Sequence, residues 1–159
     1  MEEVLQLLAE DARLSAAQIA ERTGRPEQEV KQAIAEFEKN GVIRCYKTVV
    51  NWEKAGVEYV FGFIEVRASP EREVGFDAVA ERIMGFPEVH SLYLMSGTYD
   101  LLVVVQGKTM REVAYFVAER LAPIDHVLST ATHFVLKRYK VDGDVLEEGT
   151  ETKRLPVTP

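Results

Sequence analysis

The stretch MSGTYDLLVVV (residues 95–105) joins a glycine-containing turn to an uninterrupted run of aliphatic side chains. Short turns with glycine connect antiparallel strands, and β-branched residues are typical of the strands themselves. This stretch therefore predicts a β-hairpin with strands over residues 88–96 and 99–107. Tyr99 and Asp100 lie where the second strand begins, which raises the question of whether the turn is also part of a binding site.

The segments around this hairpin alternate between the sequence periods of strands and of helices. Residues 57–68 and 127–141 are predicted as strands, and residues 71–85 and 109–121 as helices with one apolar face. Together with the hairpin they give the order β-α-β-β-α-β. This is the order of a ferredoxin-like unit.

The strands of this unit are apolar on both sides. The apolar side chains alternate between one face (Val60, Ile64, Val66, Leu101, Val103, Val105) and the other (Tyr59, Phe61, Phe63, Leu102, Val104). An antiparallel sheet with helices on one face usually exposes a polar second face to water. Because the helices can cover only one face, we expect the other to meet the same sheet of a second copy. Cover by loops or by the C-terminal tail is the alternative.

The first 50 residues predict three helices and a strand. Ser15 begins a capping-box pattern that opens the second helix, and Gly24 ends it. The third helix follows Pro26 at once, and a joint this short is typical of a helix-turn-helix. Residues 42–51 are rich in β-branched side chains, which favours a strand that serves as a wing or a hinge.

These patterns divide the chain into two domains of an α+β protein. We predict a winged helix-turn-helix domain in residues 1–50, a linker in residues 51–56 and a ferredoxin-like domain in residues 57–142. The polar segment 143–159 is expected to be loose or to add an edge strand.

Composition excludes several classes of protein. The net charge of −7 divides into −2 for residues 1–50 (seven basic, nine acidic) and −5 for residues 51–159 (twelve basic, seventeen acidic). Neither part has the basic excess usual in proteins that bind nucleic acid. The single cysteine, Cys45, is expected to be buried, and it excludes an internal disulfide and a multi-cysteine zinc site. The apolar runs are too short to span a bilayer, so we expect a cytoplasmic protein with no membrane contact, no cofactor and no metal.

Four stretches together resemble the leucine-responsive regulatory protein/AsnC (Lrp/AsnC) family of transcription regulators. They are LAEDARLSAAQIAERTG (8–24), NGVIRCYKTVVN (40–51), MSGTYDLLVVV (95–105) and STATHFVLKRYK (129–140). Their order and spacing, over nearly the whole chain, carry the resemblance. It implies an N-terminal domain that binds double-stranded DNA and a C-terminal domain that binds a small-molecule effector, usually an amino acid. It also implies a homodimer or a larger assembly such as an octamer.

The third helix departs from the family pattern because it is acidic where basic residues are expected. Glu27 and Glu29 lie in its first turn, where they favour the helix dipole but repel phosphates. The resemblance places groove contacts on this helix and backbone contacts just after it, on Arg25, Gln28, Lys31, Gln32, Arg44 and Lys47. The alternative is a helix-turn-helix that is retained only as a scaffold.

The resemblance also places the effector where turns 97–100 of adjacent subunits meet the start of the last strand. An aspartate can accept an ammonium group, while backbone N–H groups and hydroxyls can donate to a carboxylate. The implied effector-binding residues are Gly97, Thr98, Tyr99, Asp100, His126, Ser129, Thr130 and Thr132. The structural alternatives are that Gly97 serves a turn with positive φ, that Asp100 braces the loop, and that the hydroxyl residues are ordinary strand residues.

Two other functions stay open at this point. The architecture is similar to that of haem-pathway decarboxylases that act on sirohaem, in which His126, His90 or Arg111 would be the acid–base or propionate partners. The other is a ligand-sensing oligomeric module that does not bind DNA, which the acidic third helix favours. The histidines lack the spacing of a metal site, and no catalytic residue stands out. We therefore expect a regulator that is not an enzyme.

Overall fold

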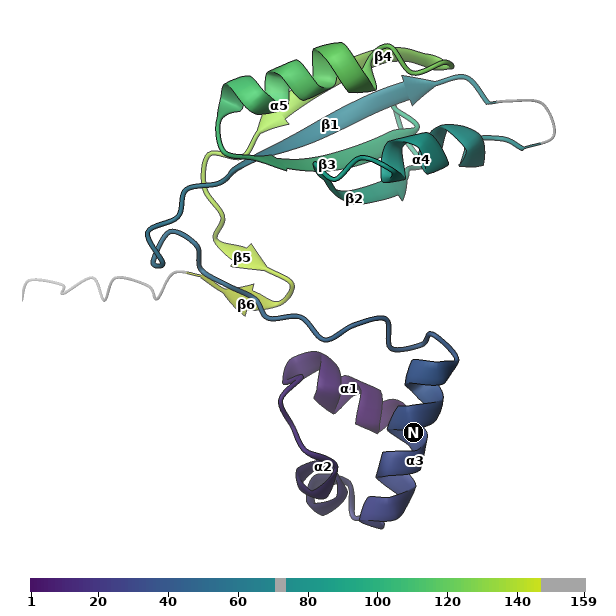
Figure 1. Ribbon diagram of the computed structural model, residues 1–159, viewed down its shortest axis with the longest axis vertical. Coiled ribbons are helices and arrows are strands. Elements are labelled where there is room, and N and C mark those ends of the chain that lie inside the picture. The colour runs from purple at the N-terminus through teal and green to yellow at the C-terminus, as the bar shows by residue number, and fades with distance from the viewer. Residues whose placement is uncertain (71–73, 147–159) are drawn as a thin grey trace, which may run out of the picture. The chain divides into compact units, whose positions relative to one another are not determined.

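Helices α1, α2 and α3 form the N-terminal unit of the computed structural model, which describes residues 1–70 and 74–146 (Figure 1). The helices span Glu2–Glu10 (α1), Ala16–Thr23 (α2) and Glu27–Lys39 (α3). Their apolar sides meet in a core that contains Val4, Leu8, Ile19, Ala20 and Val30. Each large aliphatic side chain buried in this way contributes about 1.5–3 kcal/mol. This unit comprises residues 1–50, and the second unit begins at Asn51.

α2 begins with the predicted capping box and ends at the predicted glycine. The Ser15 hydroxyl accepts a hydrogen bond from Gln18 N (3.3 Å), and the Gln18 side-chain oxygen accepts one from Ser15 N (2.9 Å). These two bonds complete a capping box. Gly24 ends α2 in the left-handed conformation at φ +68°, which glycine adopts without steric cost. The capping box and the glycine stop are therefore confirmed.

The strand predicted over residues 42–51 does not form. All of these residues are described, and none of them pairs in a ladder. β-Branched side chains favour a strand only where a neighbouring strand can take up its backbone hydrogen bonds, and within residues 1–50 the regular elements are all helices. Cys45, which lies in this segment, is exposed, so the expectation that it is buried was also wrong.

In the described part of the second unit, four strands form an antiparallel sheet in the order β2-β3-β1-β4. The elements are β1 (Val60–Ala68), α4 (Asp77–Met84), β2 (Val89–Leu94), β3 (Leu101–Gly107), α5 (Met110–Phe116), the π-helical turn η1 (Val117–Leu121) and β4 (Val127–Phe134). The predicted β-α-β-β-α-β order and the α+β fold class are thus confirmed. None of the described helices is long and apolar enough to cross a membrane.

Helices α4 and α5 cover one face of this sheet, and the main core lies beneath them (Figure 1). Ile64 of β1 pairs with Val103 of β3, and both side chains are fully buried in this core. Gly62 of β1 lies under α5, where an added Cβ would lie 2.9 Å from Val113 Cγ1. A larger residue at position 62 would therefore force α5 away from the sheet.

The opposite face of the sheet carries no helix in the described ranges. Its centre is apolar, because Phe63 and Val104 pair there, and Phe63 remains 39% exposed. Further along β1 the face becomes polar, and His133 Nε2 lies 3.4 Å from Glu65 Oε1. The expectation of an apolar second face is therefore confirmed for its centre and wrong for the end near Arg67.

A short hairpin of β5 (Lys140–Val141) and β6 (Asp144–Val145) follows the sheet. The Asn51 side chain donates a hydrogen bond to Leu146 O (2.8 Å) at the end of this hairpin. The first residue of the second unit is thereby tied to its C-terminal hairpin. Residues 147–159 of the predicted tail lie outside the described residues.

Candidate functional site

Asp100 connects the 97–100 turn to the end of β1. Its carboxylate Oδ2 accepts a hydrogen bond from Ala68 N (2.9 Å), and its own N–H donates to Val66 O (3.0 Å). Its carbonyl oxygen accepts a hydrogen bond from Met95 N (2.8 Å), which closes the turn between β2 and β3. Asp100 therefore braces the loop. Its second carboxylate oxygen, Oδ1, has no hydrogen bond to any described residue.

Gly97, Thr98 and Tyr99 make up the rest of the turn. Gly97 and Thr98 are exposed, and Tyr99 is half-buried. Arg67 Nε donates a hydrogen bond to Thr98 O (3.1 Å), so β1 supports the turn at a second point. Gly97 does not have a positive φ, and a Cβ at this position would meet no atom within 4 Å. The structural alternative for Gly97, a turn that needs a positive φ, is therefore excluded.

His126 lies at the same end of the sheet, just before β4. Ser69 N donates a hydrogen bond to His126 O (2.9 Å), and Ser69 Oγ lies 3.2 Å from His126 Nδ1. His126 has a φ of +71°, a left-handed conformation that costs a non-glycine residue about 1–3 kcal/mol. The two contacts with Ser69 hold the histidine in this conformation, which fixes the position of its ring.

The three hydroxyl residues predicted on the last strand do not share one face. Because side chains alternate along a strand, Ser129 points to the face of the sheet that carries no described helix, called here the open face. Thr130 and Thr132 point to the face under the helices. Thr132 also lies about 7 Å further along β4 than Thr130. A single chain therefore gathers the 97–100 turn, His126 and Ser129 at one end of the sheet and leaves Thr132 apart.

Arg67 and Ser69, which hold the turn and His126 in place, were not predicted from the sequence. Both residues lie at the end of β1, between the start of β3 and the start of β4. Their only signal in the sequence is that polar residues follow an apolar strand, and this is common at any exposed strand end. Their importance becomes visible only when the register of three strands is known.

Two ion pairs engage the basic residues at the start of α3. Arg25 Nη1 lies 2.7 Å from Glu29 Oε1, and Lys31 Nζ lies 2.6 Å from Glu27 Oε1. Each pair joins residues four positions apart, an arrangement that stabilises a helix by about 0.3–0.5 kcal/mol. The acidic residues that favour the helix dipole thus also neutralise two of the cations predicted to contact DNA.

The other predicted DNA contacts are exposed. Gln28 and Gln32 lie beside Lys31 on one side of α3, opposite the buried Val30. Arg44 and Lys47 are exposed in the segment after α3. This side of the N-terminal unit therefore offers amides and cations that are accessible to a ligand.

Tyr46 joins the segment after α3 to the helix through a hydrogen bond. Its hydroxyl donates a hydrogen bond to Glu38 Oε1 (2.8 Å). Partial burial raises the pKa of Tyr46 above its ordinary value, and the hydrogen bond and the negative charge of Glu38 raise it further. The bond holds the segment that carries Arg44 and Lys47 near the end of α3.

The residues considered for an enzyme do not come together. His90 on β2 lies near the Gly107 end of the sheet, while His126 lies at the end near Asp100. These ends are about 20 Å apart, given the length of β3. Arg111 forms a hydrogen bond with Tyr115 on α5 (3.3 Å). Within the residues that the structure describes, no three histidine, cysteine, aspartate or glutamate side chains are grouped so that they could hold a metal ion.

Family models match both units of the chain. A model described as winged helix-turn-helix DNA-binding covers residues 2–44, and one described as Lrp/AsnC ligand binding domain covers residues 62–145, which include the 97–100 turn. The chain belongs to the Lrp/AsnC family of transcription regulators. This Lrp/AsnC protein is thus a DNA-binding regulator with a ligand-binding domain, and not an enzyme.

Relatives of this Lrp/AsnC protein match it along most of its length. It is 49% identical over 158 residues to the HTH-type transcriptional regulator YugG of Bacillus subtilis, with 99% of this chain and 95% of that protein covered. The transcriptional regulator NMB0573 of Neisseria meningitidis, solved as an L-Met complex, is 25% identical with a TM-score of 0.69, over 87% of this chain and 89% of that one. E. coli AsnC shares the fold, with a TM-score of 0.68 at 19% identity over 87% and 91% of the two chains.

Proposed function

We propose that this regulator senses a free amino acid at the 97–100 turn and that the bound amino acid changes its affinity for DNA. The observation that carries this proposal is the position of Asp100. One carboxylate oxygen is held by Ala68 N, while the other has no hydrogen bond among the described residues. A carboxylate oriented in this way is a good acceptor for an ammonium group. The L-Met complex of NMB0573 supports an amino acid as the ligand.

The carboxylate of the amino acid needs hydrogen-bond donors. The N–H groups of Gly97 and Thr98 donate to no described residue, and the Ser129 hydroxyl lies at the same end of the sheet. We assign the carboxylate to these donors, with Tyr99 and His126 at the border of the site. Thr130 and Thr132 point under the helices, so we assign them no direct contact with the ligand.

We propose that the open face of the sheet is the surface of a homodimer. Phe63 lies at its apolar centre beside the buried Val104 and is itself 39% exposed, and an exposed apolar side chain favours association. A twofold dimer uses the same patch on both partners, so one surface suffices. An octamer built from such dimers is the larger assembly that the family resemblance implies.

For DNA, we propose groove contacts from α3 and its start, and phosphate contacts from the segment that follows. The residues are Arg25, Gln28, Lys31 and Gln32 for the groove, and Arg44 and Lys47 for the backbone. Arg25 and Lys31 must leave their glutamate partners to do so. Exposed ion pairs contribute less than about 1 kcal/mol each, so breaking them lowers the free energy of DNA binding only slightly. A dimer doubles the number of contacts and strengthens binding further.

Fluorescence anisotropy with DNA from upstream of the gene tests this proposal. The full chain is titrated onto the DNA at several salt concentrations, with and without each common amino acid. We expect affinity to fall steeply with salt and to change with one amino acid or a chemically related few. No binding at low salt would contradict the DNA assignment. An amino-acid response that survives in Asp100→Asn would contradict the assignment of the ligand site.

A further inference from the structure

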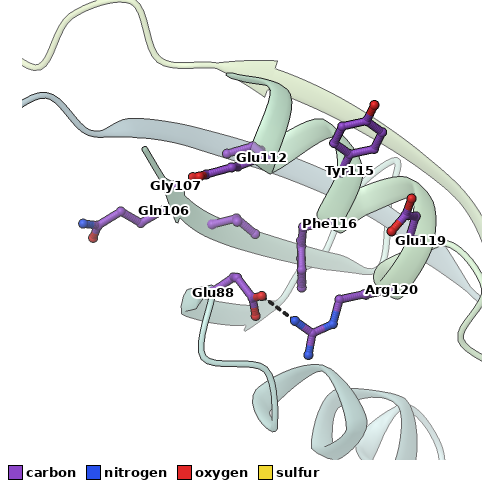
Figure 2. Close-up of a pocket in the computed structure, with 10 residues that line it drawn as sticks. Glu88, Gln106, Gly107, Glu112, Tyr115, Phe116, Glu119 and Arg120 are labelled. Carbon is purple, nitrogen blue, oxygen red and sulfur yellow. Dashed lines mark hydrogen bonds and ion pairs between the residues drawn. The ribbon is translucent and has the colours of Figure 1, made fainter. Parts of the chain in front are cut away.

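α5 and the turn η1 form one continuous helical segment with a buried side and an exposed side. The buried side packs into the main core through Val113, Phe116, Val117 and Leu121. Figure 2 shows the two sides, with Phe116 pointing toward the sheet and Tyr115 pointing away from it. The outer side of this segment is therefore a surface that another molecule can reach.

Three residues, each four positions from the next, form a line along this outer side. They are Arg111, Tyr115 and Glu119, called here the α5 ridge. All three are exposed, and Tyr115 keeps 50% of its surface accessible. Residues four positions apart lie nearly above one another on a helix. In η1, where Ala122 N donates to Val117 O (2.8 Å), a turn takes more residues than in an α-helix, which keeps Glu119 in line with Tyr115.

The two charges of the α5 ridge can still bind other groups. Arg111 Nη2 forms a hydrogen bond with the Tyr115 hydroxyl (3.3 Å), and Arg111 Cζ lies 5.5 Å from the centroid of the same ring. These contacts hold the guanidinium along the ridge and leave most of its five N–H groups for a carboxylate. Glu119 forms no hydrogen bond or ion pair with any residue that the structure describes. The ridge therefore presents a cation at one end and a carboxylate at the other.

This arrangement of charges is complementary to itself. Tyr115 is four positions from Arg111 in one direction and four from Glu119 in the other. When two copies pack this segment antiparallel about a twofold axis at Tyr115, Arg111 of each copy lies opposite Glu119 of the other. The small side chains of Ala114 and Ala118, which are also exposed, allow the two helices to approach closely.

The remaining charges of the segment do not oppose this packing. The same twofold axis brings Glu112 opposite Ala118 and Arg120 opposite Met110. Like charges are therefore not placed against each other, and Met110, which is 52% exposed, adds apolar surface near the end of the contact.

We propose that the α5 ridge is a contact between two copies of this chain, packed antiparallel about a twofold axis at Tyr115. Two ion pairs between Arg111 and Glu119 and the contact of the two Tyr115 rings hold the copies together. α5 covers the other side of the sheet from the open face, so this contact can join one open-face dimer to the next. One short helix buries little surface, so the contact is weak and forms at higher protein concentrations than the dimer. It depends on neither the amino-acid site nor DNA.

Exchanging the charges of Arg111 and Glu119 tests this contact. Sedimentation equilibrium of the full chain gives the dissociation constant of the association beyond the smallest species, and we expect the wild-type mass to rise with concentration. Arg111→Glu or Glu119→Arg alone places like charges at both pairs, so each should raise that dissociation constant more than about tenfold. The double variant restores both pairs with reversed signs and should return to within about threefold of the wild type.

The single variants also exclude an effect of overall charge. Arg111→Glu makes this acidic chain more negative and Glu119→Arg makes it less negative, so a change in general repulsion would act on them in opposite directions. Lys54→Glu and Glu53→Arg make the same charge changes in the exposed turn before β1 and should keep the wild-type dissociation constant.

A wild-type mass that does not rise with concentration would overturn the proposal. A double variant that associates as weakly as the single variants would overturn it too. If the open face is not the dimer surface, the smallest species is one chain in place of two, while the pattern among these variants stays the same. Failure of the α5 contact is therefore distinguishable from failure of the open-face dimer.

Discussion

The Asp100 carboxylate accepts a hydrogen bond from the backbone N–H of Ala68, with 2.9 Å between Oδ2 and N. Thirty-two positions separate these residues, and the bond joins the turn before β3 to the end of β1. Asp100 is therefore a structural residue whichever ligand the turn receives. The bond leaves Oδ1 without a hydrogen bond to a described residue, so the same carboxylate can brace the loop and still accept a hydrogen bond from the proposed ligand.

Two substitutions at position 100 separate these roles. Asp100→Ala removes the acceptor for Ala68 N and should lower the free energy of unfolding by about 1–2 kcal/mol. Asp100→Asn keeps a side-chain oxygen for that bond and loses only the charge, so its stability should stay close to that of the wild type. Both variants should lose the amino-acid response. Denaturant unfolding measures the first effect, and DNA anisotropy with amino acids measures the second.

A response that is lost in Asp100→Ala but normal in Asp100→Asn would contradict the binding role. The charge would then be dispensable, and Asp100 would only brace the loop.

The salt dependence of DNA binding tests the backbone contact proposed for Lys47. Each phosphate contact made by a cation adds about one unit to the slope of log K against log salt, so Lys47→Ala should reduce the slope by about 1. Lys54→Ala, which removes an exposed lysine from the second unit, is the control. If Lys47→Ala and Lys54→Ala both give the wild-type slope, Lys47 does not contact phosphate. In the same titrations Glu27→Gln, which frees Lys31 from its 2.6 Å ion pair, should raise the affinity for DNA.

The distance between α5 and the sheet depends on Gly62. A Cβ at this position would lie 2.9 Å from Val113 Cγ1, and Val113 is buried, so its packing in the core would have to shift. Gly62→Ala should therefore lower the free energy of unfolding by about 1–3 kcal/mol. Gly97→Ala is the control, because its Cβ meets no atom within 4 Å; it should change stability by less than about 0.5 kcal/mol. Thermal and denaturant unfolding compare the two, and equal stabilities would mean that α5 adjusts without cost.

The order of elements could be predicted because it depends on local periodicity. Alternation along residues 57–68 and the helical spacing of Val113 and Val117 each repeat within a few positions, so one segment suffices to recognise them. The capping box at Ser15 is equally local and was also predicted. Such signals identify what a segment forms and which of its faces is buried.

Pairing between distant segments could not be predicted in this way. Residues 42–51 have the composition of a strand but no partner, and composition does not encode a partner. The positions of Arg67 and Ser69 beside the candidate site depend on the registers of β1 with β3 and β4. The split of Ser129 from Thr130 and Thr132 follows from the same registers. Residues of the candidate site that lie within one turn could therefore be predicted from the sequence. Residues that reach it only through the pairing of distant strands could not.

The open face of the sheet can be tested as a dimer surface through Phe63. Phe63→Asp places a carboxylate at its apolar centre, and burying an unpaired charge in an interface costs several kcal/mol. The dimer should therefore dissociate at protein concentrations at which the wild type is dimeric, by a factor of more than about thirty in dissociation constant. Met84→Asp makes the same change at an exposed position on α4 and should leave the assembly intact. Light scattering after size exclusion distinguishes them, and a Phe63→Asp variant with the wild-type mass would assign the dimer to another surface.

The pKa of Tyr46 gives a test of the contact between α3 and the segment after it. Partial burial, the hydrogen bond to Glu38 and the charge of Glu38 all raise this pKa, so the folded protein favours the protonated phenol. The stabilisation is complete below the unfolded-state pKa of about 10 and is lost as the pH rises through the higher folded-state value. Glu38→Gln removes the charge, so the pKa should fall toward, but not reach, the ordinary value. The tyrosinate absorbance of each protein, minus that of its Tyr46→Phe counterpart, isolates this residue; an unchanged pKa in Glu38→Gln would mean that the charge of Glu38 does not contribute, because a glutamine oxygen can still accept the hydrogen bond.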